Sequence, residues 1–137
     1  MASELKVNTL TGVSTAGSIA VTGEGNSTTT NLQQGLVKAW INFDGSGTVS
    51  TNDSFNVSTL TDNAIGENTT TVTNAFGNAH STSTSLGLRQ HSTNYPVIAS
   101  TDGTTTTTAV KIVHNVFNNS DRADCDVMTH NFMGDLA

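Results

Sequence analysis

Residues 38–63 read KAWINFDGSGTVSTNDSFNVSTLTDN, and the spacing of apolar side chains in this stretch indicates the class of fold. In its first part apolar residues occupy every second position, which are Ala39, Ile41 and Phe43. A strand here would direct these side chains to one face and Trp40, the only tryptophan of the chain, to the other. The DGSG segment at 44–47 is a turn signal, because glycine accepts the positive φ that tight hairpins need. The stretch therefore predicts a β-hairpin.

A second alternating run lies at 55–60, FNVSTL, and predicts a strand with Phe55 and Val57 on the same face. Further strands are expected at 68–76, 81–88, 96–100, 105–117 and 125–133, with turns at 100–103 and 118–121. No alternation of strands with helices of the βαβ kind occurs. Short strands separated by turns are typical of an all-β fold, here an antiparallel, jelly-roll-like β-sandwich.

The composition agrees with this fold class. Thr, Ser and Asn dominate, aromatic residues are only 5% of the chain, and there is one Pro. Thr favours the pleated, half-buried surface of a sheet, whereas Asn, Ser and Gly favour turns. A length of 137 residues fits one domain with a short arm.

The charge balance excludes several classes of partner. The formal net charge is -6, and five cationic side chains lie far apart in the sequence: Lys6, Lys38, Arg89, Lys111 and Arg122. A nucleic-acid binder needs clustered cations, so we expect neither nucleic acid nor membrane insertion. The lone Cys125 cannot form a disulfide within one chain. The first residues lack the pattern of a signal peptide, so we expect synthesis in a cytoplasm without use of the Sec route.

The chain changes in character near residue 35. We expect residues 1–35 to be an attachment arm with a linker and residues 36–137 to be the sandwich. The arm carries isolated apolar residues, which are Leu5, Val7, Leu10, Val13, Ile19 and Val21. These side chains are too few to form a core of their own, so the arm must dock on a partner.

The 38–63 stretch resembles a repeated signature, K-A-W-x-N-F followed by a Gly-rich turn and S-F-N-V-S, of a β-rich module in phage virion proteins. Such modules occur especially in tail-fibre and related appendage proteins of marine phages. The closing FMGDLA and the opening MASELKVNTLTGVSTAGSIAV are similar to the corresponding parts of these proteins. Asn68-Thr69-Thr70 stands where the family usually carries an aromatic residue, which implies either a weaker core there or a changed neighbour.

The resemblance implies a homotrimeric structural protein of the virion, attached through its N-terminal arm as a short tail fibre or related appendage. We expect the core or the trimer interface to contain Trp40, Ile41, Phe43, Phe55 and Val57. A capsid decoration protein, of the cement or head-fibre kind, is the first alternative, and the short chain favours it. A carbohydrate-binding module is the second. Other virion proteins and a host-surface glycan are the expected partners besides further copies of the chain.

No motif for catalysis or for a cofactor is present, so we expect no enzyme and no resident metal. The four histidines, His80, His91, His114 and His130, lack the His-x-His spacing of metal-binding fibres and are expected at the surface or between chains. Three copies of one histidine on a threefold axis remain a possible metal site.

Asp124-Cys125-Asp126 predicts a solvated face for the two carboxylates and a buried thiol. Cys125 and His130 are expected on opposite faces of a strand, about 16 Å apart, too far for a nucleophile and its base. No Gly-x-Ser-x-Gly elbow occurs, and the carboxylates are too scattered to nominate a glycosidase pair.

Three expectations concern contacts between copies. Trp40 could stack on a sugar, but we expect it in the core or at a trimer interface, because a chain with few aromatic residues usually packs its only tryptophan. Only 34% of the residues are hydrophobic, so one chain alone would be marginally stable and an obligate or near-obligate homotrimer is expected. The threonine run at 104–108 is expected to be strand that packs between copies.

Overall fold

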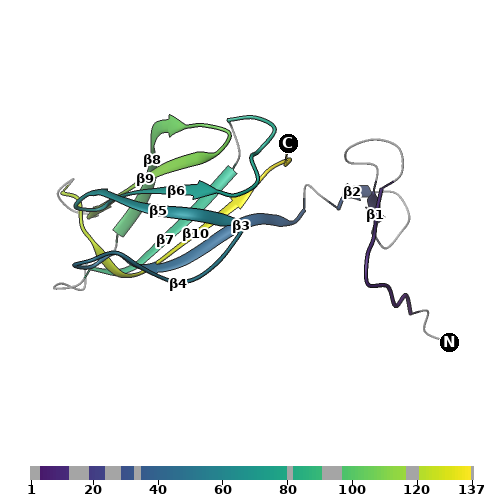
Figure 1. Ribbon diagram of the computed structural model, residues 1–137, viewed down its shortest axis with the longest axis horizontal. Helices are drawn as coiled ribbons and strands as arrows, with labels where there is room; N and C mark the ends of the chain where they lie inside the picture. The colour runs from purple at the N-terminus through teal and green to yellow at the C-terminus, as the bar shows by residue number, and fades with distance from the viewer. Residues whose placement is uncertain are drawn as a thin grey trace. The chain divides into compact units, whose positions relative to one another are not determined.

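Ten β-strands and no helix form the regular structure of the described residues (Figure 1). A computed structural model of the chain describes residues 4–12, 19–23, 29–32, 35–79, 82–90, 97–116 and 121–136, with the backbone alone described at 82–90 and 102–104. The chain divides into two units, Met1–Leu36 and Val37–Ala137. The second of these is called the two-sheet unit below.

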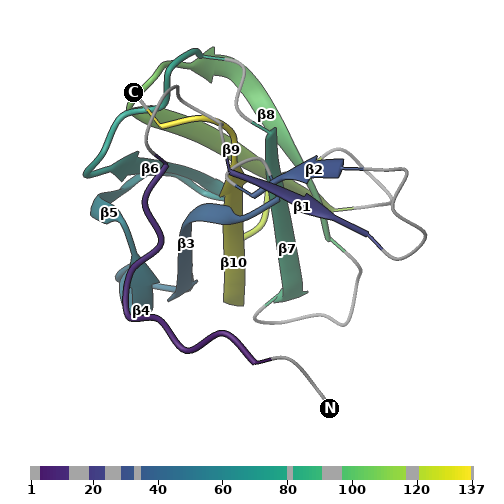
Figure 2. The same ribbon diagram turned by 90° about the vertical axis from the view of Figure 1, so that its right-hand side faces the viewer.

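The two-sheet unit consists of two antiparallel sheets of four strands each. The first sheet has the order β4-β3-β10-β7 (Figure 2), and the second has the order β5-β6-β9-β8. Their strands are β3 (Val37–Asp44), β4 (Ser50–Phe55), β5 (Val57–Ala64), β6 (Glu67–Val72), β7 (Thr82–Gln90), β8 (Val97–Thr105), β9 (Ala109–Val116) and β10 (Cys125–Met133). The all-β, antiparallel class predicted from the sequence is confirmed.

The hydrophobic core lies between the two sheets. One cluster joins Ala39 and Phe132 of the first sheet to residues of the second sheet and of the chain that follows β6: Val72, Phe76, Val110 and Ile112. Another cluster contains Ile41, Phe43, Cys125 and Met128. The alternation predicted for β3 is confirmed, because Ala39, Ile41 and Phe43 are fully buried whereas Trp40 on the opposite face is partly exposed.

The strand predicted at 55–60 is wrong, because the chain changes sheets within it. β4 ends at Phe55 in the first sheet, and β5 begins at Val57 in the second. Asn56 between them has a φ of 55°, which Asn tolerates better than most residues. Its side chain donates to the Lys38 carbonyl at 2.9 Å and accepts from the backbone N–H of Asn74 at 2.9 Å. These contacts stabilise the corner between β4 and β5, which the alternating pattern of apolar residues did not predict.

The threonine run at 104–108 is mainly a hairpin turn, so the prediction of a strand from 105 and a turn at 100–103 is wrong. β8 continues to Thr105, with a register irregularity after Thr101, and β9 begins at Ala109. The Thr106 hydroxyl accepts the backbone N–H of Ala109 at 2.9 Å and that of Thr108 at 3.3 Å. Such side-chain contacts with the backbone compete with strand pairing. Residues 106–108 are exposed and form no strand within the chain.

Cys125 and His130 are both fully buried, which contradicts the expectation that they lie on opposite faces. Register shifts occur between Cys125 and Val127 and between Val127 and Met128. A bulge adds a residue on one strand and so reverses the alternation of faces beyond it. The predicted burial of the Cys125 thiol is confirmed, and Asp124 and Asp126 are partly exposed.

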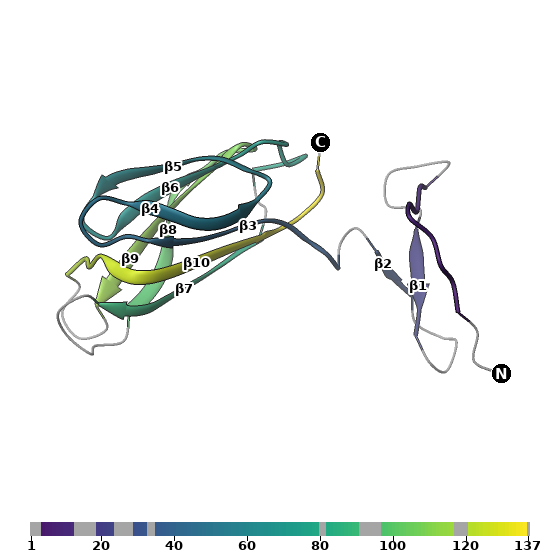
Figure 3. The ribbon, with the colours of Figure 1, turned by 60° about the horizontal axis from the view of Figure 1, so that its bottom comes forward.

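The N-terminal unit contains a short antiparallel pair, β1 (Ala20–Thr22) and β2 (Thr29–Asn31), seen side by side in Figure 3. The Leu32 N–H donates to the Ile19 carbonyl at 2.8 Å and continues this pairing. Residues 4–12 form no strand. Of the predicted arm residues, Leu5, Val7, Leu10 and Val21 are exposed, Ile19 is partly buried, and Val13 lies outside the described residues.

The turn between β5 and β6 packs closely on the segment that leads into β10. Gly66 has a φ of +64°. Its N–H donates to Asp124 Oδ1 at 2.6 Å, and its carbonyl accepts the N–H of His114 at 2.7 Å. A Cβ at this position would lie 2.6 Å from the Ala123 nitrogen and 2.8 Å from the His114 oxygen. These are backbone atoms, so a side chain at residue 66 would separate three segments of the fold.

We therefore expect Gly66→Ala to lower the free energy of unfolding by roughly 2 to 4 kcal/mol, from left-handed backbone strain combined with overpacking. Gly47→Ala is the matched control, because Gly47 has a φ of +63° but no atom within 4 Å of its Cβ position. That variant should lose only about 1 to 2 kcal/mol. Urea unfolding measures both. Equal losses would show that the close approach around Gly66 contributes nothing.

Candidate functional site

Two histidines meet in the interior of the two-sheet unit. His130 of β10 in the first sheet and His114 of β9 in the second are both 0% exposed. Their Nε2 atoms are 3.5 Å apart. On its other side, His130 Nδ1 lies 3.0 Å from the hydroxyl of Thr70, which belongs to β6. A chain of polar contacts thus crosses the core from one sheet to the other.

Aromatic rings enclose His130. The Phe43 ring meets it edge-on with centroids 4.9 Å apart, and the Phe132 ring does so at 6.2 Å. The His114 and His130 rings are nearly parallel, with an interplanar angle of 12° and centroids 5.5 Å apart. These neighbours fix the orientation of His130, and with it the direction of its two ring nitrogens.

Burial keeps both imidazoles neutral. Burial, together with the smaller effect of the nearby His114, lowers the pKa of His130 to about 3. Burial also lowers the pKa of His114. A hydrogen bond with the Gly66 backbone and the negative charge of Asp124 raise this pKa, but their combined effect is smaller than that of burial. A neutral imidazole has one N–H donor and one acceptor nitrogen, so one Nε2 donates and the other accepts. Thr70 then completes the chain, because its hydroxyl can either donate or accept.

Asn68 adds a further polar group to this interior. It is 1% exposed and lies two residues before Thr70, on the same face of β6. In register it stands opposite Ile112, so that His114 is its diagonal neighbour. Within the described residues neither side-chain polar atom of Asn68 has a hydrogen-bond partner. A buried amide without partners costs about 1 to 3 kcal/mol, whereas Thr70 is satisfied by His130.

These buried histidines predict acid sensitivity. The unfolded chain binds a proton on each imidazole near pH 6.5, but folded His130 does so only near pH 3. Lowering the pH below 6.5 therefore favours the unfolded chain, by up to about 1.4 kcal/mol per pH unit for His130. We expect the free energy of unfolding to be level above pH 7 and to fall between pH 6.5 and 5, where carboxylates still contribute little.

The His130→Gln variant is the control for this prediction, since glutamine keeps hydrogen-bonding capacity and cannot titrate. Chemical denaturation at half-unit pH steps gives the free energy of unfolding at each pH. Between pH 6.5 and 5 this free energy should fall less steeply with pH in the variant than in the wild type, by the contribution of about one bound proton. A wild-type stability that stays constant between pH 7 and 5 would contradict neutral, buried histidines.

No metal centre forms among the described residues, where no three His, Cys, Asp or Glu side chains gather closely enough to hold an ion. The Cys125 thiol lies 3.9 Å from the Ala123 carbonyl. His80 and His91 lie outside the described residues, and the threefold-axis metal hypothesis stays untested. The buried histidines themselves are closed to solvent, so the arrangement can hold the sheets together but cannot reach an external substrate.

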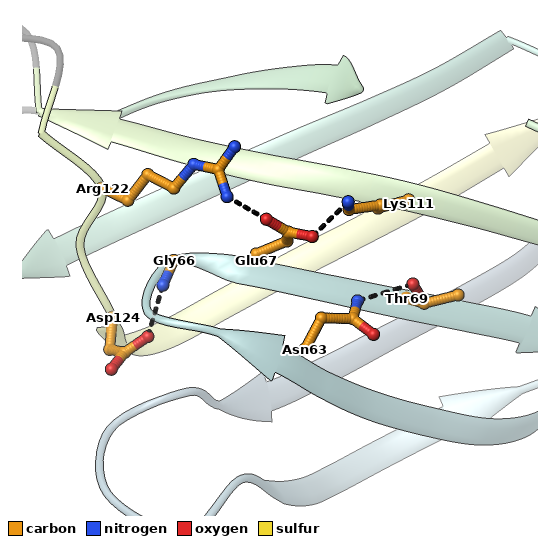
Figure 4. Close-up of polar contacts among 7 residues, drawn as sticks. All are labelled: Asn63, Gly66, Glu67, Thr69, Lys111, Arg122 and Asp124. Atoms are coloured by element: carbon orange, nitrogen blue, oxygen red, sulfur yellow. Dashed lines mark hydrogen bonds and ion pairs between the residues drawn. The ribbon is translucent and has the colours of Figure 1, made fainter. Parts of the chain in front are cut away.

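A second polar cluster lies on the second sheet (Figure 4). The Glu67 carboxylate contacts Lys111 of β9 and Arg122 of the segment before β10. The Glu67 side chain is 10% exposed, and those of Lys111 and Arg122 are 23% and 42% exposed. Beside it Asn63 donates to the Thr69 hydroxyl at 2.7 Å. The cluster ties the chain at 122–124 to β6 and β9, next to the Gly66 turn.

The outer face of the first sheet carries two aromatic side chains. Trp40 of β3 and Phe55 of β4 are direct partners in register, and both point away from the core. Phe55 is 55% exposed and Trp40 is partly exposed. Among the other residues expected in the core or interface, Ile41 and Phe43 are fully buried and Val57 packs partly buried against both core clusters.

The expectation that all histidines lie at the surface or between chains is wrong for His114 and His130, which contact each other within one chain. The sequence contains a signal for this. In AVKIVHNV at 109–116 the alternating positions are Val110, Ile112, His114 and Val116, so His114 takes a core position. His130 stands likewise between Met128 and Phe132. Thr70 takes a core position of β6 in the same way, and its hydroxyl contacts His130.

Comparison with known proteins finds no family model, no curated protein and no solved structure that matches this chain. The described part of the chain contains no helix long and apolar enough to cross a membrane.

Proposed function

We propose that the protein is a structural protein of a phage virion, a short homotrimeric tail fibre or related appendage. Its N-terminal unit attaches to another virion protein, and its two-sheet unit is a jelly-roll-like sandwich that projects from the particle. The protein performs no catalysis and holds no cofactor. This proposal rests on the resemblance of residues 38–63 to virion modules together with the exposed apolar side chains of the N-terminal unit.

The N-terminal unit supplies the observation that carries the proposal. Leu5 is 78% exposed, Val7 and Leu10 are each 56% exposed, and Val21 is 52% exposed. The described residues of this unit form two strands of three residues each, too little to bury these side chains. Exposed apolar residues gathered in one segment are typical of an interaction site. An attachment arm is the role that gives them a partner.

Association into a homotrimer is supported by the edges of the two sheets. All six residues of β4, an edge strand of the first sheet, are exposed, and so are most residues of β5 at the edge of the second. Exposed edges invite pairing with other chains, and a closed oligomer covers them. The threonine turn at 106–108 gives no support to the trimer, which rests on the edges and on the resemblance.

A capsid decoration protein is the second candidate. A cement or head-fibre protein needs an anchor and a compact body, and the exposed apolar N-terminal unit and the two-sheet unit fit these two parts. The attachment arm serves both functions alike. Imaging of the labelled protein on head or tail separates them.

The test compares the full chain with a Leu5→Ser, Leu10→Ser double variant, and with Lys6→Ser, Thr9→Ser as the matched control on the same segment. Sedimentation velocity at micromolar concentration should give three times the mass of one chain for all three proteins. In phage particles the double variant should fall to a small fraction of normal occupancy, because its anchor has lost apolar area. The control variant should assemble normally.

Two results would contradict the proposal. A stable, folded monomer in sedimentation removes the homotrimer. Normal occupancy of the double variant in particles shows that Leu5 and Leu10 do not anchor the protein.

A further inference from the structure

The outer face of the first sheet combines an aromatic row with a polar row. The aromatic row runs across β10, β3 and β4 through Asn131, Trp40 and Phe55, which are partners in register. The next row on this face contains Thr129, Asn42 and Asp53. An open sheet face with two neighbouring aromatic side chains offers an extended surface on which a ligand can lie.

The polar row is held in place by its own hydrogen bonds. Asn42 Nδ2 donates to the Thr129 hydroxyl at 3.1 Å, and Asn42 Oδ1 accepts from Asn52 Nδ2 at 3.0 Å. Asp53 Oδ1 accepts the backbone N–H of Ser54 at 2.8 Å. These side chains keep further acceptor capacity toward solvent, because an amide or carboxylate oxygen has two lone pairs or more. Hydroxyl donors of a ligand lying on the aromatic row would find fixed acceptors beside it.

The charge of this face selects among ligands. Asp44 and Asp53 share the face of Trp40, since they follow the alternation and register of β3 and β4. Lys38 is only 8% exposed, so among the described side chains this face presents carboxylates and no exposed cation. Anionic ligands such as nucleic acids, phosphates and uronic acids would be repelled. A neutral ligand with many hydroxyl groups is complementary to it.

We propose that this face binds a neutral oligosaccharide, with sugar rings stacked on Trp40 and Phe55 and their hydroxyls hydrogen-bonded to the row of Asn42 and Asp53. One face of a pyranose ring presents C–H groups, which pack well on aromatic rings, while its rim presents hydroxyls. The inference names a ligand class for the virion protein proposed above and takes its biological setting from that proposal. The binding itself is a property of the isolated chain.

A second copy of the chain fits this face less well. The centres of interfaces between proteins are depleted in charged residues such as Asp. Covering Trp40 and Phe55 with another chain would also remove Asp53 from water, which costs several kcal/mol when the carboxylate gains no partner. A sugar brings hydroxyl donors to the same carboxylate. The trimer edges proposed above must therefore leave this face open.

The experiment uses Trp40 as its own reporter, because it is the only tryptophan in the chain. The full-length protein is titrated with neutral hexasaccharides of glucose, mannose and N-acetylglucosamine, and with a galacturonate hexasaccharide as the anionic comparison. We expect at least one neutral sugar to cause a saturable change in tryptophan fluorescence, and the galacturonate to cause none.

Phe55→Ala should weaken the binding about tenfold, a typical effect of removing one stacked ring. Ile65→Ala is the matched control, since Ile65 is 66% exposed in the β5–β6 turn, away from the aromatic row, and it should bind like the wild type. Calorimetric titration gives the same comparison without fluorescence. Circular dichroism confirms that both variants remain folded.

Three results would overturn the inference. No neutral sugar changes the fluorescence, or Ile65→Ala weakens binding as much as Phe55→Ala, or the fluorescence depends on protein concentration without sugar because a second copy covers Trp40. Sedimentation measures the oligomeric state independently of sugar binding, so failure of the glycan inference can be told apart from failure of the proposed function. A monomer that binds sugar through Phe55 would contradict the trimeric virion protein and leave the glycan face standing.

Discussion

The contact of His130 with Thr70 and His114 is the constraint on which the packing of the two sheets depends. All three side chains are fully buried, and each would leave a polar atom without a partner if the sheets shifted against one another. Such a loss costs about 1 to 3 kcal/mol for each group, a large part of the stability of a small domain. An apolar core would tolerate several packings, whereas this chain of contacts is complete in one arrangement. The Gly66 turn and the Glu67 cluster reinforce that arrangement from the second sheet, because both tie the segment at 122–124 to β6 and β9.

The sequence predicted those parts of the fold that depend on local pattern. The alternation of Ala39, Ile41 and Phe43 identified the core face of β3, since burial with period two is a property of the strand itself. The hydrophobic pattern gave a wrong prediction where one residue changes the direction of the chain. Asn56 transfers the chain between sheets, the Thr106 hydroxyl closes a turn, and the bulge after Cys125 brings the thiol to the core side. Each of these depends on a backbone conformation or a tertiary contact that a hydrophobic pattern does not record.

The candidate sites divide in the same way. Core positions of His114 and His130 could be read from their apolar neighbours, but their pairing with each other and with Thr70 depends on how β6, β9 and β10 are brought together by the topology. These interior groups stabilise the fold, whereas the surfaces that can meet partners lie elsewhere. They are the apolar side chains of the N-terminal unit and the aromatic row of the first sheet. The proposed virion role uses the former for attachment and leaves the latter open to a glycan.

Nitrogen NMR of the imidazole rings tests the central claim, that a neutral histidine pair joins the sheets, most directly. At pH 7 the account predicts that one Nε2 carries a proton and the other does not, that this proton exchanges slowly with water, and that His130 remains neutral down to at least pH 5. Two imidazoles that titrate near pH 6.5 with rapidly exchanging protons would show that the pair is open to solvent, and would contradict the account.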